Sequence, residues 1–185
     1  MDPLGDKISL PKEVNNHLEK YWGLARRFFQ EGDAALAAFF AITLIEEVGK
    51  IIILGNRDLS GTLDNRGYRN HEQKYALAVA MTLKVNARVT RVYGGHESRF
   101  AAWFRNKLLF RMRNAALYTE LQGDSPQTPA QAIQATDAAL LVCIAGEVYG
   151  EIQGTYTRTG PDNYMRIITE VDQFREKHQS LLGSA

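Results

Sequence analysis

Apolar side chains recur at helical spacing in each long segment of the chain. In the first segment Val14, Leu18 and Trp22 are four residues apart and share one helix face, and Gly32 provides a stop. Asp33 then suits the N-cap of the next helix. The pattern predicts six helices, over approximately 11–31, 33–54, 71–92, 97–121 and 128–156, with a last one ending near residue 182.

No segment shows the apolar and polar alternation of a strand convincingly. The stretch 166–171 alternates weakly, but its neighbours fit a helix. Polar stretches rich in glycine and proline separate the helical segments and read as loops, including 123–129. The sequence therefore predicts one all-α domain over 1–185, an antiparallel bundle of five to seven helices without a sheet.

Composition narrows the class of protein. A chain of 185 residues suffices for one domain with a substantial core. A net charge of +1 gives no general basic field of the kind that marks many nucleic-acid-binding proteins, although it leaves room for a local site. Cys143 is the only cysteine, which excludes an intramolecular disulfide and a cysteine-based metal cluster. The first residues lack the basic start and apolar core of a signal peptide, so a cytoplasmic location is expected.

The most apolar segment, 34–54, contains three charges: Glu46, Glu47 and Lys50. Its length would allow a membrane span, but each charge near the centre of a span costs about 2.5–3.5 kcal/mol. A helix buried within a bundle fits better, and no membrane association is expected.

The two adjacent carboxylates cannot point the same way, because consecutive helical residues are rotated by about 100°. Glu46 and Lys50, four apart, share a face. At least one carboxylate is expected to face the interior, where it needs a cationic or hydrogen-bonding partner. The candidates are His71 and Lys74, three residues apart, and the arginines near residue 113. A buried ion-pair network that fixes helix register and a functional polar site both fit this pattern.

Three short motifs in order resemble the abortive-infection AbiV family of the HEPN superfamily. They are "IEEVGK" at 45–50, "NHEQK" at 70–74 and "RNAALYTE" at 113–120, and the resemblance covers roughly 33–150. It implies a helical bundle from a superfamily with many RNases in toxins and antiphage systems. Its active motif is an arginine, commonly followed by a polar residue, with a histidine after four to six intervening positions.

The resemblance implies specific site residues. Arg113 and Asn114 match the start of the active motif, but Tyr118 stands four intervening residues on, where the AbiV-type pattern has tyrosine and the superfamily has histidine. The first and second motifs add a supporting polar cluster and a histidine: Glu46, Glu47, Gly49, Lys50, His71 and Lys74. No metal and no cofactor is expected.

These residue types suit metal-independent RNA cleavage. Arg113 can bind a phosphate through its planar donor fork, and Asn114 can position a phosphate or a ribose. A tyrosine hydroxyl such as that of Tyr118 is a poor general base near neutrality. His71 is therefore expected to supply acid–base chemistry, provided that it reaches the same cleft.

A homodimer is expected for two reasons. Arg113 and Tyr118 would be about 140° apart on an ideal helix, so a second protomer would help to complete the site. The predicted helix 97–121 also carries aromatic and aliphatic residues on more than one face, interleaved with arginines, which interface cores favour. A symmetric dimer with Arg113 and Tyr118 near the two-fold axis is predicted.

Two functions follow as hypotheses. The first is an antiphage abortive-infection protein that acts on RNA or the translation machinery as a metal-independent, ribonuclease-like toxin, with a phage protein as a candidate trigger. The second is a non-catalytic HEPN-like bundle that binds a protein partner or a nucleotide. Tyrosine at the histidine position favours the second, and the Arg113–Asn114 pair favours the first.

Overall fold

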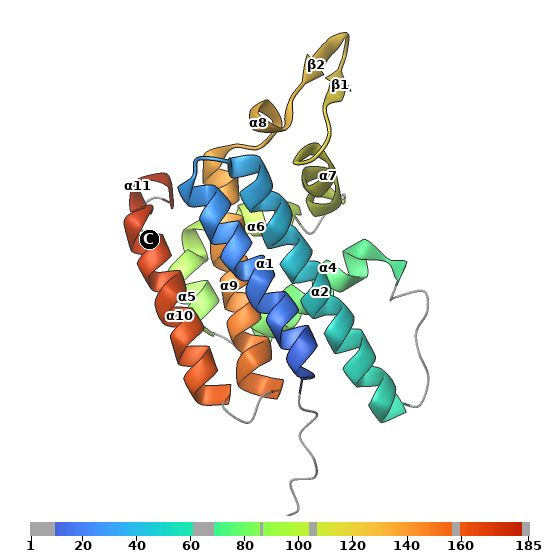
Figure 1. Ribbon diagram of the computed structural model, residues 1–185, viewed down its shortest axis with the longest axis vertical. Coiled ribbons are helices and arrows are strands. Elements are labelled where there is room, and N and C mark those ends of the chain that lie inside the picture. The colour runs from blue at the N-terminus through green and yellow to red at the C-terminus, as the bar shows by residue number, and fades with distance from the viewer. Residues whose placement is uncertain (1–9, 61–68, 86, 104–106, 157–159, 183–185) are drawn as a thin grey trace, which may run out of the picture.

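The computed structural model describes residues 10–60, 69–85, 87–103, 107–156 and 160–182. Long helices lie side by side and enclose one hydrophobic core, while a small hairpin projects from one end (Figure 1). The helices are α1 (Lys12–Gln30), α2 (Ala34–Ser60), α4 (His71–Val85), α5 (Ala87–Tyr93), η1 (Gly94–His96), α6 (Glu97–Trp103), α7 (Leu108–Ala115), α8 (Pro129–Ala132), α9 (Ala135–Tyr156), α10 (Gly160–Lys177) and α11 (Gln179–Leu182). The strands are β1 (Glu120–Gln122) and β2 (Ser125–Gln127). The predicted all-α helical bundle is confirmed.

Two helices form the centre of the bundle. Every residue of α9 from Ala138 to Gly150 is buried, because this stretch is apolar or small on all its faces except at Glu147. The other central helix, α2, contacts α1, α4 and α9, and α10 packs on α9. Within the described residues, no helix combines the length and the apolarity that crossing a bilayer requires. The apolar segment 34–54 is thus an internal helix of the bundle.

The turn between α1 and α2 follows the sequence signals. Gly32 has a positive φ of +85°, a conformation that glycine adopts without strain. The Oδ1 atom of Asp33 accepts a hydrogen bond of 2.9 Å from the backbone N–H of Leu36, which confirms the predicted N-cap. This turn fixes the direction in which α2 enters the core.

The middle of the chain is more divided than predicted. The described residues of the predicted helix 71–92 form α4 and α5, and those of the predicted helix 97–121 include α6 and α7; residues 86 and 104–106 lie outside the described residues. The described residues therefore contain more and shorter helices than the five to seven expected. Lys107, which precedes α7, has φ of 56°, so the helix begins after a residue in the left-handed region. The apolar periodicity of the segment 97–121 contains no local signal for the break before α7.

A two-stranded hairpin replaces part of the predicted loop after residue 121. Strands β1 and β2 are antiparallel, with Leu121 opposite Pro126 and Gln122 opposite Ser125. Gly123, the first residue of the two-residue turn, has φ of +64°, as in the turns that suit tight hairpins. The expectation of no sheet is wrong at this one place.

Several large apolar residues of the segment 97–121 pack inside this chain. Phe100, Trp103 and Leu109 are 7%, 2% and 0% exposed, and Phe104 lies outside the described residues. These buried side chains need no second copy to cover them. The composition of this segment was one of the two reasons for expecting a dimer, and these buried side chains remove that reason.

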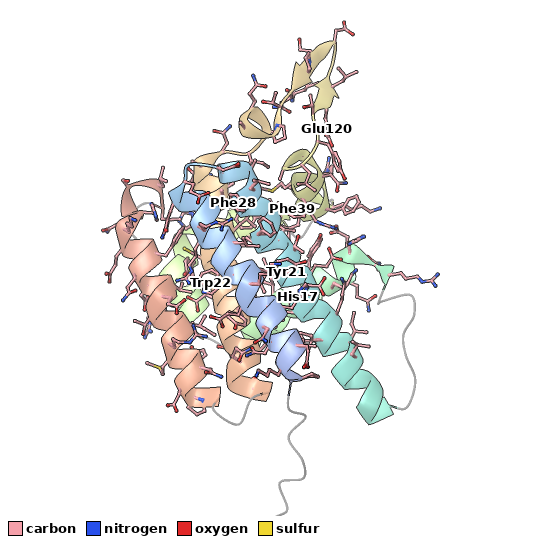
Figure 2. All side chains as sticks on the ribbon, in the orientation of Figure 1. His17, Tyr21, Trp22, Phe28, Phe39 and Glu120 are labelled. Carbon is pink, nitrogen blue, oxygen red and sulfur yellow. The ribbon has the colours of Figure 1, made fainter. Side chains whose placement is uncertain are left out.

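A row of partly buried aromatic rings follows the contact between α1 and α2. Phe28 stacks on Phe40 with ring centroids 5.5 Å apart. The ring centroids of Tyr21 and Phe39 lie 5.9 and 5.2 Å from that of Phe40. Figure 2 shows Tyr21, Phe28 and Phe39 along this side of the bundle. The row ends at Phe39, beside which the guanidinium of Arg113 lies, 5.9 Å from the ring.

Candidate functional site

The carboxylate of Glu46 is the centre of a buried polar cluster. Its Oε1 lies 2.8 Å from Lys74 Nζ and 3.0 Å from His71 Nδ1. Its Oε2 accepts hydrogen bonds of 3.1 Å from both Arg113 and the hydroxyl of Tyr75. These five residues are called the Glu46 cluster. They confirm that one of the two adjacent carboxylates faces the interior and meets the predicted cations.

Three members of the cluster come from the first turns of α4. His71, Lys74 and Tyr75 are spaced at i, i+3 and i+4, so they share the face that contacts α2. The helix begins where the Oδ1 atom of Asn70 accepts a hydrogen bond of 3.3 Å from the N–H of Gln73. The sequence prediction missed Tyr75, although its position next to Lys74 and four residues from His71 is the signal that would have identified it.

Gly49 allows α4 to approach α2 this closely. A Cβ atom at Gly49 would lie 2.1 Å from the backbone oxygen of Lys74, a distance that no real Cβ contact tolerates. Gly49 is three residues after Glu46, so it lies on nearly the same face of α2. The glycine of the "EEVGK" motif is therefore a packing requirement that brings Lys74 to the Glu46 carboxylate.

The cluster keeps Glu46 ionised. Burial by itself would raise the pKa of this carboxyl, but its contacts with Lys74 and His71 outweigh burial and lower the pKa from 4.5 to about 2. Burial and the Glu46 charge raise the pKa of Tyr75, so its hydroxyl stays a hydrogen-bond donor. The centre of the site is thus a permanent negative charge held by fixed donors.

The members differ in their access to solvent. The side chains of Glu46 and Lys74 are 5% and 4% exposed, whereas those of Arg113 and His71 are 26% and 38% exposed. The Nδ1 atom of His71 is near Glu46 but is not aligned for a straight hydrogen bond, and the ring also contacts Phe110, with centroids 5.0 Å apart. An arginine and a histidine therefore reach the surface from opposite oxygens of one buried carboxylate.

Glu47 and Lys50 form the outer edge of this site. Their side chains are 25% and 26% exposed and pair at 2.5 Å. Lys50 also lies 3.8 Å from Oε1 of Glu46. Glu47 is thus the outward member of the two adjacent carboxylates.

Asn114 and Tyr118 lie differently from Arg113. Helix α7 ends at Ala115, and the carbonyl oxygen of Asn114 accepts hydrogen bonds of 3.0 Å from the N–H groups of Leu117 and Tyr118. The side chain of Asn114 is half-buried, whereas Tyr118 lies beyond the helix and is 63% exposed. The tyrosine that contacts Glu46 is Tyr75 rather than Tyr118. Of the predicted catalytic residues, the structure brings Arg113 and His71 together.

Glu72 is a further acidic group beside the cluster that the sequence did not indicate. Its Oε1 atom is buried and has no hydrogen-bond partner among the residues that the structure describes. Burial raises the pKa of Glu72, while the charges of Lys107, His71 and Arg111 act in the opposite direction. Glu72 places a second carboxylate next to the exposed His71.

Comparison with known proteins gives one clear family. The family model HEPN_AbiV, described as AbiV, matches residues 8–150. This span includes every residue of the Glu46 cluster and the hairpin that follows α7. No curated protein and no solved structure matches the chain.

Proposed function

The chain belongs to the AbiV family of abortive-infection HEPN-domain proteins, and on this basis we propose that it is an antiphage, metal-independent ribonuclease-like toxin. Its substrate is RNA, free or within the translation machinery, and its place of action is the cytoplasm. One observation supports this proposal most: His71 and Arg113 contact opposite oxygens of the buried Glu46 carboxylate while both side chains remain partly exposed.

His71 supplies the acid–base chemistry in this proposal. Because Nδ1 faces Glu46, the other ring nitrogen, Nε2, is the one that a substrate meets. The imidazole takes the proton of the ribose 2′-hydroxyl as the 2′-oxygen attacks phosphorus. The bond from phosphorus to the 5′-oxygen breaks, that oxygen takes a proton from water, the imidazolium of His71 returns its proton to the resulting hydroxide, and a 2′,3′-cyclic phosphate remains. No oxidant, reductant or external group is consumed.

Arg113 stabilises the phosphate in the same step. A guanidinium has five donors, and the single hydrogen bond to Glu46 engages NH1 alone. The Arg113 side chain is 26% exposed, so part of the guanidinium is accessible to a ligand. The Glu46 carboxylate and the Phe39 ring hold the group in place, so its other donors can meet the charge that develops on phosphorus.

A second function is favoured by the position of Tyr118. This residue occupies the place of the superfamily histidine, yet it is 63% exposed and outside the Glu46 cluster. In this alternative the bundle is non-catalytic, and the site binds a protein partner or a nucleotide. A homodimer, in which Tyr118 meets a second copy, and a phage protein as trigger are part of both proposals.

The deciding experiment incubates the purified chain with total RNA, with and without a metal chelator. We expect cleavage that chelation does not abolish, and its loss in Arg113→Ala and His71→Ala. Arg111→Ala is the matched control, because it removes the same charge from an exposed position on α7 and leaves the Glu46 cluster intact. Circular dichroism melts would show that each variant is folded.

Two results would contradict catalysis. Intact RNA at every concentration of the native chain would favour the non-catalytic alternative. Equal cleavage by native, Arg113→Ala and His71→Ala chains would place the activity elsewhere. Relief of toxicity on expression by Arg113→Ala, but not by Arg111→Ala, would support the proposal in cells.

A further inference from the structure

The hairpin of β1 and β2 extends beyond the ends of the helices (Figure 1), and exposed apolar side chains gather at its start. Leu117, Tyr118 and Leu121 are 40%, 63% and 76% exposed. They make up half of the large apolar side chains that are exposed in the described part of the chain. Single exposed apolar residues are ordinary, but this concentration within five residues is typical of an interaction surface.

The backbone of β1 has a free hydrogen-bonding edge. Gln122 and Ser125 flank the two-residue turn, so they share the first hydrogen bonds of the ladder. The next pair, Leu121 and Pro126, is then a non-hydrogen-bonded pair, in which N–H and C=O groups point away from the opposite strand. The N–H and C=O of Leu121 therefore lie on the outer edge of the hairpin, where a further strand can bind.

The other edge of the hairpin is blocked. Pro126 occupies the corresponding outward position of β2, and proline has no N–H to donate. A strand can thus be added beside β1 but not beside β2. Any assembly through this hairpin stops after one addition instead of growing into a filament.

We propose that the open edge of β1 pairs, antiparallel, with β1 of a second copy of this chain, about a two-fold axis at Leu121. In this register Leu121 lies opposite Leu121 of the second copy, and Glu120 lies opposite Gln122 of the second copy. No like charges face each other, so the edge is complementary to itself.

The size of this surface sets the strength of the dimer. Strands of three residues with a few apolar side chains bury much less than the surface of a standard stable interface. The dimer is therefore weak, with a dissociation constant in the micromolar range or above. The proposal concerns association alone and does not require that the chain cleaves RNA.

Leu121→Pro tests the backbone part of the interface. The substitution removes the outward N–H of residue 121, which the hairpin itself does not use, and circular dichroism would show that the variant is folded. We expect the dissociation constant from sedimentation equilibrium to rise about tenfold or more. Leu121→Val, which keeps the N–H and the strand preference, is the matched control and should dimerise like the native chain.

Leu121→Cys tests the two-fold register. Paired residues of this kind have Cα atoms about 5.5 Å apart, within the range of a disulfide. Mild oxidation should give a covalent dimer, whereas the native chain, whose single cysteine is buried, and the exposed Glu176→Cys variant should not cross-link efficiently. Two results would overturn the proposal. One is a native chain that stays monomeric at several hundred micromolar. The other is a dimer that Leu121→Pro does not weaken and that Leu121→Cys does not cross-link. Either result would leave the β1 edge to an extended strand of another protein.

Discussion

Two buried glutamates, one on each central helix, meet an arginine and a tyrosine but have different surroundings. Glu46 on α2 contacts Arg113 and Tyr75, and Lys74 and His71 besides. Glu147 on α9 is 0% exposed and receives hydrogen bonds of 3.1 Å from Arg88 and from Tyr93. The difference lies in the number of cations and in access to solvent.

The cluster around Glu147 has the features of a structural clamp. Arg88 also pairs with Asp172 of α10 at 2.5 Å, so one side chain joins α5 to both α9 and α10. Burial raises the pKa of Glu147 in spite of its contacts with Arg88 and Tyr93. Around Glu46 the additional contacts with Lys74 and His71 reverse that balance, and the side chains of His71 and Arg113 reach the surface. A carboxylate with a strongly lowered pKa and partly exposed partners is more typical of a functional site than a fully buried pair is.

The largest expected effect is that of removing the Glu46 charge. Glu46→Gln leaves Lys74 buried without its anion, which typically costs about 3–5 kcal/mol of unfolding free energy. Glu147→Gln should cost roughly 1–2 kcal/mol, because Arg88 keeps Asp172 as a partner. Urea unfolding measures both, and the partly exposed Glu47→Gln serves as the control with little effect. Equal losses at Glu46 and Glu147 would remove the distinction between the two clusters.

Acid should affect the two clusters in opposite directions, weakening the one around Glu46 and not the one around Glu147. The folded pKa of Glu46, about 2, lies below its ordinary value of 4.5, so its stabilisation is complete above pH 4.5 and is lost as the pH falls toward 2. The expected loss is roughly 3 kcal/mol. The raised pKa of Glu147 has the opposite sign, because the folded state then binds its proton more tightly than the unfolded state.

Unfolding free energies measured across this pH range test the assignment. The native chain and Glu147→Gln should lose stability steeply below pH 4.5, and Glu46→Gln should lose much less. A native profile as flat as that of Glu46→Gln would show that Glu46 is not held ionised.

Gly49→Ala should destabilise the chain by about 1–3 kcal/mol, because the new methyl group meets the Lys74 backbone and forces α4 away from α2. Gly23→Ala in α1 is the control, since nothing lies within 4 Å of the added Cβ, and it should stabilise by about 1 kcal/mol through helix propensity. Thermal melts would show the two shifts in opposite directions. A Gly49→Ala chain as stable as the native one would contradict the close contact between the helices.

The smallest effects distinguish the two tyrosines. Tyr75→Phe removes a buried hydrogen bond to Glu46 and should cost about 1 kcal/mol. Tyr118→Phe removes an exposed hydroxyl and should stay within about 0.5 kcal/mol of the native stability. Chemical unfolding at neutral pH measures both. A larger loss at Tyr118 than at Tyr75 would reverse the roles assigned to them.

The sequence predicted the partners of the buried carboxylate better than it predicted the connections between the helices. Charges inside an apolar helix require partners, and helical spacing limits the partners, so His71, Lys74 and Arg113 could be identified as candidates. The sequence could not show which of Glu46 and Glu47 faces inward, because the rotation of α2 is set by packing against α1, α4 and α9. The break before α7 was missed because Lys107, at φ of 56°, is not a residue that signals a left-handed conformation.

The hairpin and the position of Tyr118 were missed for a related reason. The apolar pattern runs from α7 into β1 without interruption, and a short exposed strand has no buried face to impose alternation. Only the turn at Gly123 and Asp124 carries a local signal, and it was interpreted as a loop. The 140° angle between Arg113 and Tyr118 never arises, because helix α7 ends between them.

The sequence distances within the Glu46 cluster have a consequence for protein synthesis. Lys74 is 28 residues from Glu46, and Arg113 is 67 residues from it. A nascent chain that has emerged only through α4 already holds the negative charge, its buried lysine and the histidine, but lacks the arginine. If the cluster is the centre of a toxin, the ribosome that makes it is spared until α7 has left the exit tunnel, and an incomplete chain ending before α7 is harmless.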